Sequence, residues 1–239
     1  MITLMSIITK PLNPKRMFPQ QYDKQSYIHW HETKFTADAP LLVKLDDFRT
    51  NLKTTTLDDL EFLGELLYYI IPLCKKEYKI QTGVEFEYAI PLKDALKQKE
   101  GLQFDFLFKS TDSIINKLWR KNKIDESVNV SNIKHNLTDL VRTEVVCSSL
   151  AVCNFISQRL ITGNINLPSD YELTKKLAEK IISIEFEPEM KMASGYFAYH
   201  GLVKFTSGLI VELQIYSSLT NTWRKLSHKL YEKVRLSPI

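Results

Sequence analysis

The chain lacks long hydrophobic runs and is poor in cysteine and glycine, with 3 Cys and 7 Gly among 239 residues. No apolar run approaches the roughly 20 residues that a membrane-spanning helix needs. The apolar start, residues 1–10, also lacks the basic region and small-residue cleavage site of a secretory signal. We therefore expect a cytoplasmic protein without a membrane partner, and we expect residues 1–10 to form a strand or a docked arm.

The cysteines are too few and too scattered for a disulfide framework or a zinc site. Cys147 and Cys153 lie in apolar stretches, which favours buried free thiols, and Cys74 stands far from both. Charge is not extreme either: the net charge of +4 indicates an anionic partner only weakly. Hydrophobic content of 44% and charged content of 25% are typical of a soluble globular protein. This length fits one large domain, or one domain with an added flank.

The first hundred residues predict a mainly helical flank. Four prolines and several aromatic residues between 11 and 40 indicate an irregular segment pinned by its rings, with a short helix at 23–32. Leucine spacing predicts a helix from Leu41 to about Lys53. A second helix is expected from an N-cap at Thr56, with a kink or an end at Pro72.

Residues 101–239 alternate helical and strand-like patterns and predict an α+β core domain with a mixed sheet surrounded by helices. Helical spacing is found at residues 113–123, 150–160, 171–183 and 219–234. Strand-like runs are found at residues 138–147, 201–205 and 209–216. The last two are separated by Thr206-Ser207-Gly208, which predicts a hairpin.

Lysines and serines gather where a strand-like run ends at Phe108. Lys109 and Ser110 turn the chain, Ser113 is placed to cap the next helix, and Lys117 follows one turn later. Backbone N–H groups and a hydroxyl at a helix start, with lysines nearby, favour binding of a triphosphate. The alternative interpretation is a plain capped helix with solvated lysines.

Two carboxylates are associated with strands. Asp139 stands at the entry to the valine-rich run, and Glu212 lies in the middle of a later one, sharing a face with Gln214 because side chains alternate. Carboxylates on adjacent strands can hold Mg²⁺, which polarises phosphates and orients an attacking hydroxyl. The alternative is a solvated sheet face.

An aromatic loop precedes the hairpin, with the sequence Gly-Tyr-Phe-Ala-Tyr-His from Gly195 to His200. A glycine turn that presents aromatic rings and a histidine can stack a base. The alternative is an aromatic loop that fills the core.

Taken in order, these stretches resemble the RelA/SpoT synthetase domain over roughly residues 100–235. Lys109-Ser110, Ser113-Ile114 and Lys117 are similar to its phosphate segment, and Asp139-Leu140-Val141 to its metal-binding motif. Gly195-Tyr196 with His200 is similar to its nucleoside loop, and residues 211–215 to its Glu-x-Gln strand. Trp223, His228 and residues 231–233 are similar to its closing helix.

The resemblance implies a nucleotidyltransferase-like fold that transfers the β,γ-pyrophosphate of ATP to a ribose 3′-hydroxyl. The implied ATP-binding residues are Lys109, Ser110, Ser113 and Lys117, with Lys117 also catalytic. Asp139 and Glu212 would be catalytic and would hold Mg²⁺, Glu212 being placed to activate the hydroxyl. Acceptor-binding residues would be Tyr196, which stacks on the base, His200, Gln214, Arg142 and Lys121.

Several positions depart from the family pattern. Leu107 replaces an arginine that stacks on adenine, while Arg142 and Glu144 stand where a glycine and an arginine are usual. Gly-Tyr-Phe-Ala replaces Gly-Tyr-Arg-Ser. The forms found here resemble the toxic small alarmone synthetases, of which some modify the 3′-CCA end of tRNA.

The expected function is therefore that of a growth-inhibiting toxin, a pyrophosphokinase whose acceptor is the tRNA 3′ end, with a neutralising antitoxin as a candidate partner. Basic residues that can contact RNA phosphates are Lys117, Arg120, Lys121, Lys123, Lys134, Arg142, Lys191 and Lys204. One alternative is a (p)ppGpp or (p)ppApp synthetase that uses guanine or adenine nucleotides. Another is a catalytically inactive nucleotide- or RNA-binding module. No hydrolase His-Asp motif is visible.

Overall fold

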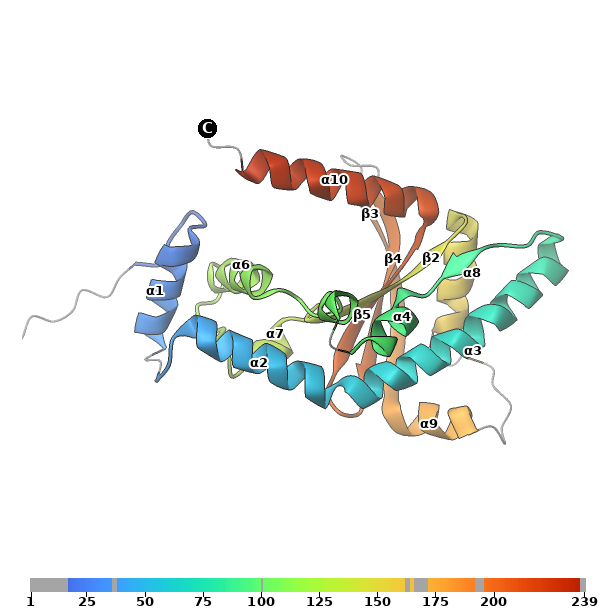
Figure 1. Ribbon diagram of the computed structural model, residues 1–239, viewed down its shortest axis with the longest axis horizontal. Helices are drawn as coiled ribbons and strands as arrows, with labels where there is room; N and C mark the ends of the chain where they lie inside the picture. Colours follow the sequence, from blue (N-terminus) through green and yellow to red (C-terminus); the bar gives the residue numbers. More distant parts are fainter. Residues whose placement is uncertain are drawn as a thin grey trace, which may run out of the picture.

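The computed structural model describes residues 17–35, 38–99, 101–161, 164–165, 172–191 and 196–236, and it forms an α+β fold with helices around one mixed sheet (Figure 1). Residues 1–10 and Gly195, for which the sequence raised expectations, are outside the described residues. The side chains of Lys191, His228 and residues 231–233 are not described either. The helices are α1 Lys24–Lys34, α2 Leu41–Thr55, α3 Leu57–Thr82, α4 Pro91–Lys97, α5 Leu102–Asp105, α6 Thr111–Asn122, α7 Ile133–Asn136, α8 Leu150–Leu160, α9 Glu172–Lys180 and α10 Ser218–Leu236. The strands are β1 Tyr88–Ala89, β2 Val141–Cys147, β3 Ile181–Lys191, β4 Tyr196–Phe205 and β5 Ile210–Ser217.

The sheet has the strand order β1-β2-β5-β4-β3. β2 and β5 pair in parallel, while β1 pairs with β2, β4 with β5, and β3 with β4 in antiparallel fashion. The predicted mixed sheet and the hairpin are thus confirmed, the hairpin turn using Gly208 at φ 84°. The strand predicted at 138–147 is present and begins at Val141. β1 comes from before residue 100, so the first hundred residues contribute a strand as well as helices.

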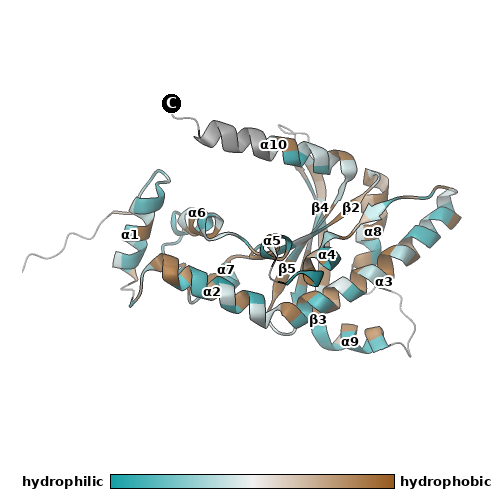
Figure 2. Ribbon diagram, in the orientation of Figure 1, coloured by the Kyte–Doolittle hydropathy of each residue, from teal (hydrophilic) through white to brown (hydrophobic). Residues whose placement is uncertain are grey.

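The sheet has one apolar and one polar face, because side chains alternate along each strand. Val211, Leu213 and Ile215 of β5 are fully buried on the side covered by α8, which in turn packs against α3. Figure 2 shows hydrophobic residues of α3 interrupted by hydrophilic ones, as expected for a helix with one buried side. On the polar face the register aligns Arg142 with Glu212, and Glu144 with Gln214.

The helix predicted at 171–183 ends earlier, because Ile181 begins the strand β3. Its glutamates at 185, 187 and 189 alternate with Ile184 and Phe186, a period-two pattern that indicates a strand. β3 is an edge strand, which explains how it accommodates Pro188. Phe186 packs over Gly201 of β4, where a Cβ would lie only 2.4 Å from the ring.

Three other local expectations change. Pro72 does not end its helix, since α3 continues to Thr82 and stops at Gly83 in a left-handed conformation (φ 74°). Ser110, and not Ser113, is the N-cap of α6, and its hydroxyl oxygen accepts from the Ser113 N–H. β4 begins at Tyr196, so this tyrosine lies in a strand and not in a loop before it.

The N-terminal helix is fixed to the core by polar contacts inside an aromatic cluster. Buried Asn122 of α6 donates to the hydroxyl of Tyr27 at 2.7 Å and pairs with both backbone groups of Val128. His31 of α1 lies in the same cluster, with the rings of Tyr27 and Phe35 at 5.9 and 4.6 Å between centroids. Within the described ranges neither ring nitrogen of His31 has a hydrogen-bond partner. Burial, assisted by the charge of Lys44, lowers the pKa of His31 from 6.5 to about 4.

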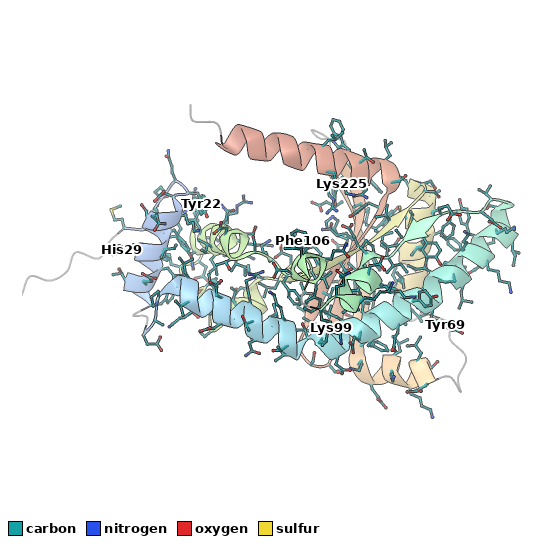
Figure 3. The ribbon with its side chains drawn as sticks, in the orientation of Figure 1. Tyr22, His29, Tyr69, Lys99, Phe106 and Lys225 are labelled. Carbon is teal, nitrogen blue, oxygen red and sulfur yellow. The ribbon has the colours of Figure 1, made fainter. Side chains whose placement is uncertain are left out.

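We predict that folding becomes acid-sensitive through His31. The unfolded chain binds the proton more readily than the folded chain, so the free energy of unfolding should fall as the pH drops from about 6.5 to about 4, and not above that window. The loss should be on the order of 3 kcal/mol. His31→Phe should flatten this part of a urea-unfolding pH profile. His29→Phe, at an exposed position on the same helix (Figure 3), should leave the slope unchanged. Equal slopes in all three proteins would exclude His31 as the cause.

Candidate active site

A cavity of about 720 Å³ lies over the polar face of the sheet and brings together most of the residues predicted from the sequence. We call it the carboxylate cavity. It is lined from α6, the sheet and α10 by Lys117, Thr138, Asp139, Arg142, Glu185, Glu187, Glu189, Tyr196, His200, Leu202, Glu212, Gln214, Trp223, Arg224 and Ser227. In Figure 1, α10 lies across one end of the strands, which explains how it closes this space. Asp139 and Glu212, which are 73 positions apart in the sequence, therefore line the same cavity.

Asp139 is held between two lysines. The ammonium group of Lys109 lies 2.8 Å from Oδ2, and that of Lys117 lies 2.7 Å from Oδ1. Burial opposes ionisation of Asp139, but the two lysines outweigh it and lower its pKa to about 2. Burial also lowers the pKa of Lys109, and the Asp139 carboxylate offsets this in part. The segment before α6 is positioned by its pairing with the start of β2: Lys109 N–H donates to Leu140 O at 2.9 Å.

Glu212 is the centre of a second set of contacts. Its Oε1 lies 2.8 Å from Nδ1 of His200 and accepts from the amide of Gln214 at 2.7 Å, so the expected shared face of Glu212 and Gln214 is present. Burial alone would raise the pKa of Glu212, but these hydrogen bonds and the charge of Arg142 hold it below the usual value. Glu212 is therefore ionised at neutral pH.

His200 connects Glu212 to the aromatic residue expected to bind a base. Its Nε2 lies 3.0 Å from the hydroxyl of Tyr196 and 2.7 Å from Oε2 of Glu189. The two rings meet edge to face at 6.0 Å. Burial raises the pKa of Tyr196 to about 12, so its hydroxyl keeps its proton. Tyr196 thus reaches the cavity as a half-buried wall residue.

Ser113 and several lysines in and before α6 line a smaller cavity of about 450 Å³, which we call the lysine cavity. Ser110 lies at the helix start, and its hydroxyl is 2.9 Å from that of Ser113. Lys109, Ser113, Lys117 and Lys121 all line this space, together with Arg120. Lys117 and Asp139 also line the carboxylate cavity, so the two spaces adjoin.

A third space, of about 720 Å³, adjoins the carboxylate cavity and was not anticipated from the sequence. We call it the phenylalanine cavity because the exposed ring of Phe106, labelled beside α5 in Figure 3, lines it next to Ile90 and Pro91. Leu107, at the position where an arginine was expected, is buried in its wall. Arg142, Gln214 and Arg224 line both this space and the carboxylate cavity.

Sequence reasoning missed two further groups at the site. The glutamates of β3 were missed because no strand was predicted after the helix expected at 171–183, although their alternation was a usable signal. Arg224 of α10 reaches Glu144 of β2 at 2.6 Å and the hydroxyl of Tyr216 at 2.5 Å. No local pattern predicts this contact between α10 and β2.

The two carboxylates expected to hold Mg²⁺, Asp139 and Glu212, both line the carboxylate cavity. In the part of the chain that the structure describes, no group of three or more His, Cys, Asp or Glu side chains is arranged to hold a metal. Mg²⁺ commonly takes one or two carboxylates and completes its shell with substrate phosphates and water. Two oxygen-bearing side chains in one cavity, Asp139 and Glu212, match that requirement.

We predict that Asp139 also stabilises the fold. Asp139→Ala leaves the buried ammonium group of Lys109 without its counter-charge, and the free energy of unfolding should fall by about 3 kcal/mol. Urea denaturation measures this loss, and adding Lys109→Met to the variant should restore most of it. Asp112→Ala, which breaks an exposed pair with Lys24, should cost under about 1 kcal/mol. Similar small losses for both single variants would contradict the assignment.

The sequence matches no protein-family model and no curated protein. Among solved structures it is similar to the small alarmone synthetase 1 from Bacillus subtilis, with 17% identity and a TM-score of 0.44 over 77% of this chain and 81% of that one. The same synthetase bound to its product pppGpp gives 16% and 0.43 over 79% and 84%. The smu.1046c protein from Streptococcus mutans UA159 gives 15% and 0.43 over 75% and 77%.

Among the described residues no helix is long and apolar enough to cross a membrane.

Proposed function

We propose that the chain is a pyrophosphokinase of RelA/SpoT type, which transfers the β,γ-pyrophosphate of ATP to a ribose 3′-hydroxyl. One observation carries the proposal: a lysine- and serine-lined space and a space with two ionised carboxylates adjoin at Lys117 and Asp139. Phosphoryl-type transfer asks a protein mainly for positioning and for neutralisation of charge. The two spaces supply cations for the donor phosphates and carboxylates for a metal ion and an attacking hydroxyl.

The lysines provide the donor site. Lys109 and Lys117 are ion-paired to Asp139, and phosphate oxygens of ATP would replace the carboxylate as their counter-charge. Backbone N–H groups at the start of α6, with the hydroxyls of Ser110 and Ser113, add neutral donors. Asp139, released from one lysine, would then be a ligand for Mg²⁺ together with Glu212. When bound, Mg²⁺ would neutralise phosphate charge.

Glu212 is placed to receive the proton of the attacking hydroxyl. Its carboxylate is ionised and is oriented by His200 and Gln214, so the acceptor's 3′-oxygen would meet a fixed proton acceptor. His200 of β4 and Gln214 of β5, which contact this carboxylate, are paired with each other across the two strands. Tyr196, linked to the same histidine, offers its ring to the acceptor base.

The phenylalanine cavity suits the base of ATP. Apolar residues and the exposed ring of Phe106 form one side of it, and an aromatic ring contributes about 1 to 3 kcal/mol to a stacked base. Arg142 and Arg224 stand between this space and the carboxylate cavity. A base stacked on Phe106 would direct its phosphates past these cations toward α6. Phe106 would then replace the missing arginine at Leu107.

The 3′ end of tRNA is our proposed acceptor. The carboxylate cavity holds Glu185, Glu187 and Glu189 in addition to Asp139 and Glu212, an arrangement that disfavours an acceptor with its own 5′-polyphosphate. A terminal adenosine brings only one phosphodiester, while the more distant RNA phosphates can reach Lys121 and Arg120 of α6. Modifying the CCA end would block translation and arrest growth, so we propose that the chain acts as a toxin, with an antitoxin as its partner.

We predict that labelled ATP transfers its pyrophosphate to deacylated tRNA. A tRNA ending in 3′-deoxyadenosine should accept no label, because only the attacking hydroxyl is missing. Glu212→Gln should lower transfer by roughly a hundredfold or more through loss of the proton acceptor. If GDP, GTP or AMP is labelled in preference to intact tRNA, the tRNA acceptor is wrong and the chain is a synthetase of (p)ppGpp or (p)ppApp. No labelling of any acceptor would favour an inactive binding module.

We predict separately that Phe106 binds the donor. Phe106→Ala should raise the KM for ATP roughly tenfold, since a stacked ring is lost, and leave the KM for the acceptor unchanged. Leu102→Ala removes a similarly exposed apolar side chain from α5, the helix just before Phe106, and should alter neither constant. If Phe106→Ala raises the KM for the acceptor and leaves the KM for ATP unchanged, the phenylalanine cavity would bind the acceptor and not ATP.

A further inference from the structure

Arg142 occupies the boundary between two cavities and is fixed there by its backbone. Its N–H donates to the carbonyl of Leu107 at 2.7 Å on one side of β2, and it lies in register with Glu212 on the other side. The side chain lines both the carboxylate cavity and the phenylalanine cavity. Its strand therefore holds it where a donor in one space and an acceptor in the other would meet.

Three cations line more than one of the three cavities, and Arg142 differs from the other two. Lys117 is paired with Asp139 at 2.7 Å, and Arg224 with Glu144 at 2.6 Å. Across the residues that the structure describes, the guanidinium of Arg142 forms no hydrogen bond or ion pair. It acts on its surroundings only through its charge, which lowers the pKa values of both Lys109 and Glu212. An anion can bind Arg142 without first breaking a protein contact.

The proposed reaction places such an anion at this boundary. A bond forms between the acceptor's O3′ and the β-phosphorus of ATP, and the bond from that phosphorus to the oxygen of the α-phosphate breaks. The hydroxyl proton passes to Glu212, and AMP leaves with the bridging oxygen. Negative charge therefore shifts onto the oxygens around the β-phosphorus as it moves between the two spaces. A planar guanidinium with five N–H donors can bind two of these oxygens at once.

We infer that Arg142 is a catalytic residue that contacts the transferred pyrophosphoryl group. This inference rests on the proposed function and differs from the sequence-based assignment of Arg142 to acceptor binding. A contact to the RNA backbone would weaken binding of long acceptors, whereas a contact to the transferred group slows transfer to every acceptor by the same factor. The two roles are therefore separable in steady-state kinetics.

The experiment compares Arg142→Ala, Arg142→Gln and Arg142→Lys with the unaltered protein at saturating ATP. Acceptors are deacylated tRNA and the shortest acceptor that the unaltered protein labels, among the trinucleotide CCA, AMP and GDP. We expect kcat to fall about 10²- to 10³-fold with both acceptors for the alanine and glutamine variants, while the KM for tRNA stays unchanged. Arg142→Lys should recover part of the rate, and added guanidinium should restore part of the activity of Arg142→Ala.

Arg159→Ala removes an arginine of α8, which pairs with Glu77, and serves as the control with unchanged transfer. The inference is overturned if the Arg142 variants keep a normal kcat, or if they raise the KM for tRNA alone and react normally with the short acceptor. Absence of transfer by the unaltered protein with any acceptor would instead overturn the proposed function itself. Thermal melting of each variant shows that the fold is kept.

Discussion

The parallel pairing of β2 with β5 is the contact on which the site depends. It aligns Arg142 with Glu212 and Glu144 with Gln214, although about seventy residues separate the two strands. Because side chains alternate, the same register that buries Val211 and Leu213 turns all four polar residues toward the cavities. A shift of one residue would exchange the two faces and place charges in the apolar core.

Charge compensation is the second constraint on this site. Two carboxylates of the polar face are paired with cations, Asp139 with two lysines and Glu144 with Arg224, while Glu212 has a hydrogen bond with His200. A nucleotide that binds through the lysines would exchange these internal pairs for its own phosphates, so the lysines would keep a counter-charge. Among the described residues Arg142 stands outside this scheme, which is why we propose a different role for it than for the lysines.

Compensation also connects stability with function. The Lys109–Asp139 pair is buried between the start of β2 and the segment before α6, so it orients the residues proposed to bind phosphate even when no substrate is present. His31 shows a different cost of burial, because its imidazole sits unpaired in an aromatic cluster that fixes α1 to the core. Both features place an ionisable group where hydration is lost, but only the first has a counter-charge.

The α+β class, the helices from Leu41 and Leu150 and the hairpin around Gly208 follow from the amino-acid sequence alone, which also selects Asp139, Glu212 and Tyr196 as candidate site residues. These rest on local periodicity, turn chemistry and motif spacing, which are properties of short segments. The assignment of Glu185, Glu187 and Glu189 to an edge strand required the folded chain, because helix and strand signals overlap around Ile181. The folded chain also shows that Arg224 reaches Glu144, that Phe106 faces a cavity, and that Arg142 lies unpaired between two spaces. These contacts depend on which strands become neighbours, and the local residue pattern of a strand does not indicate which distant strand it pairs with.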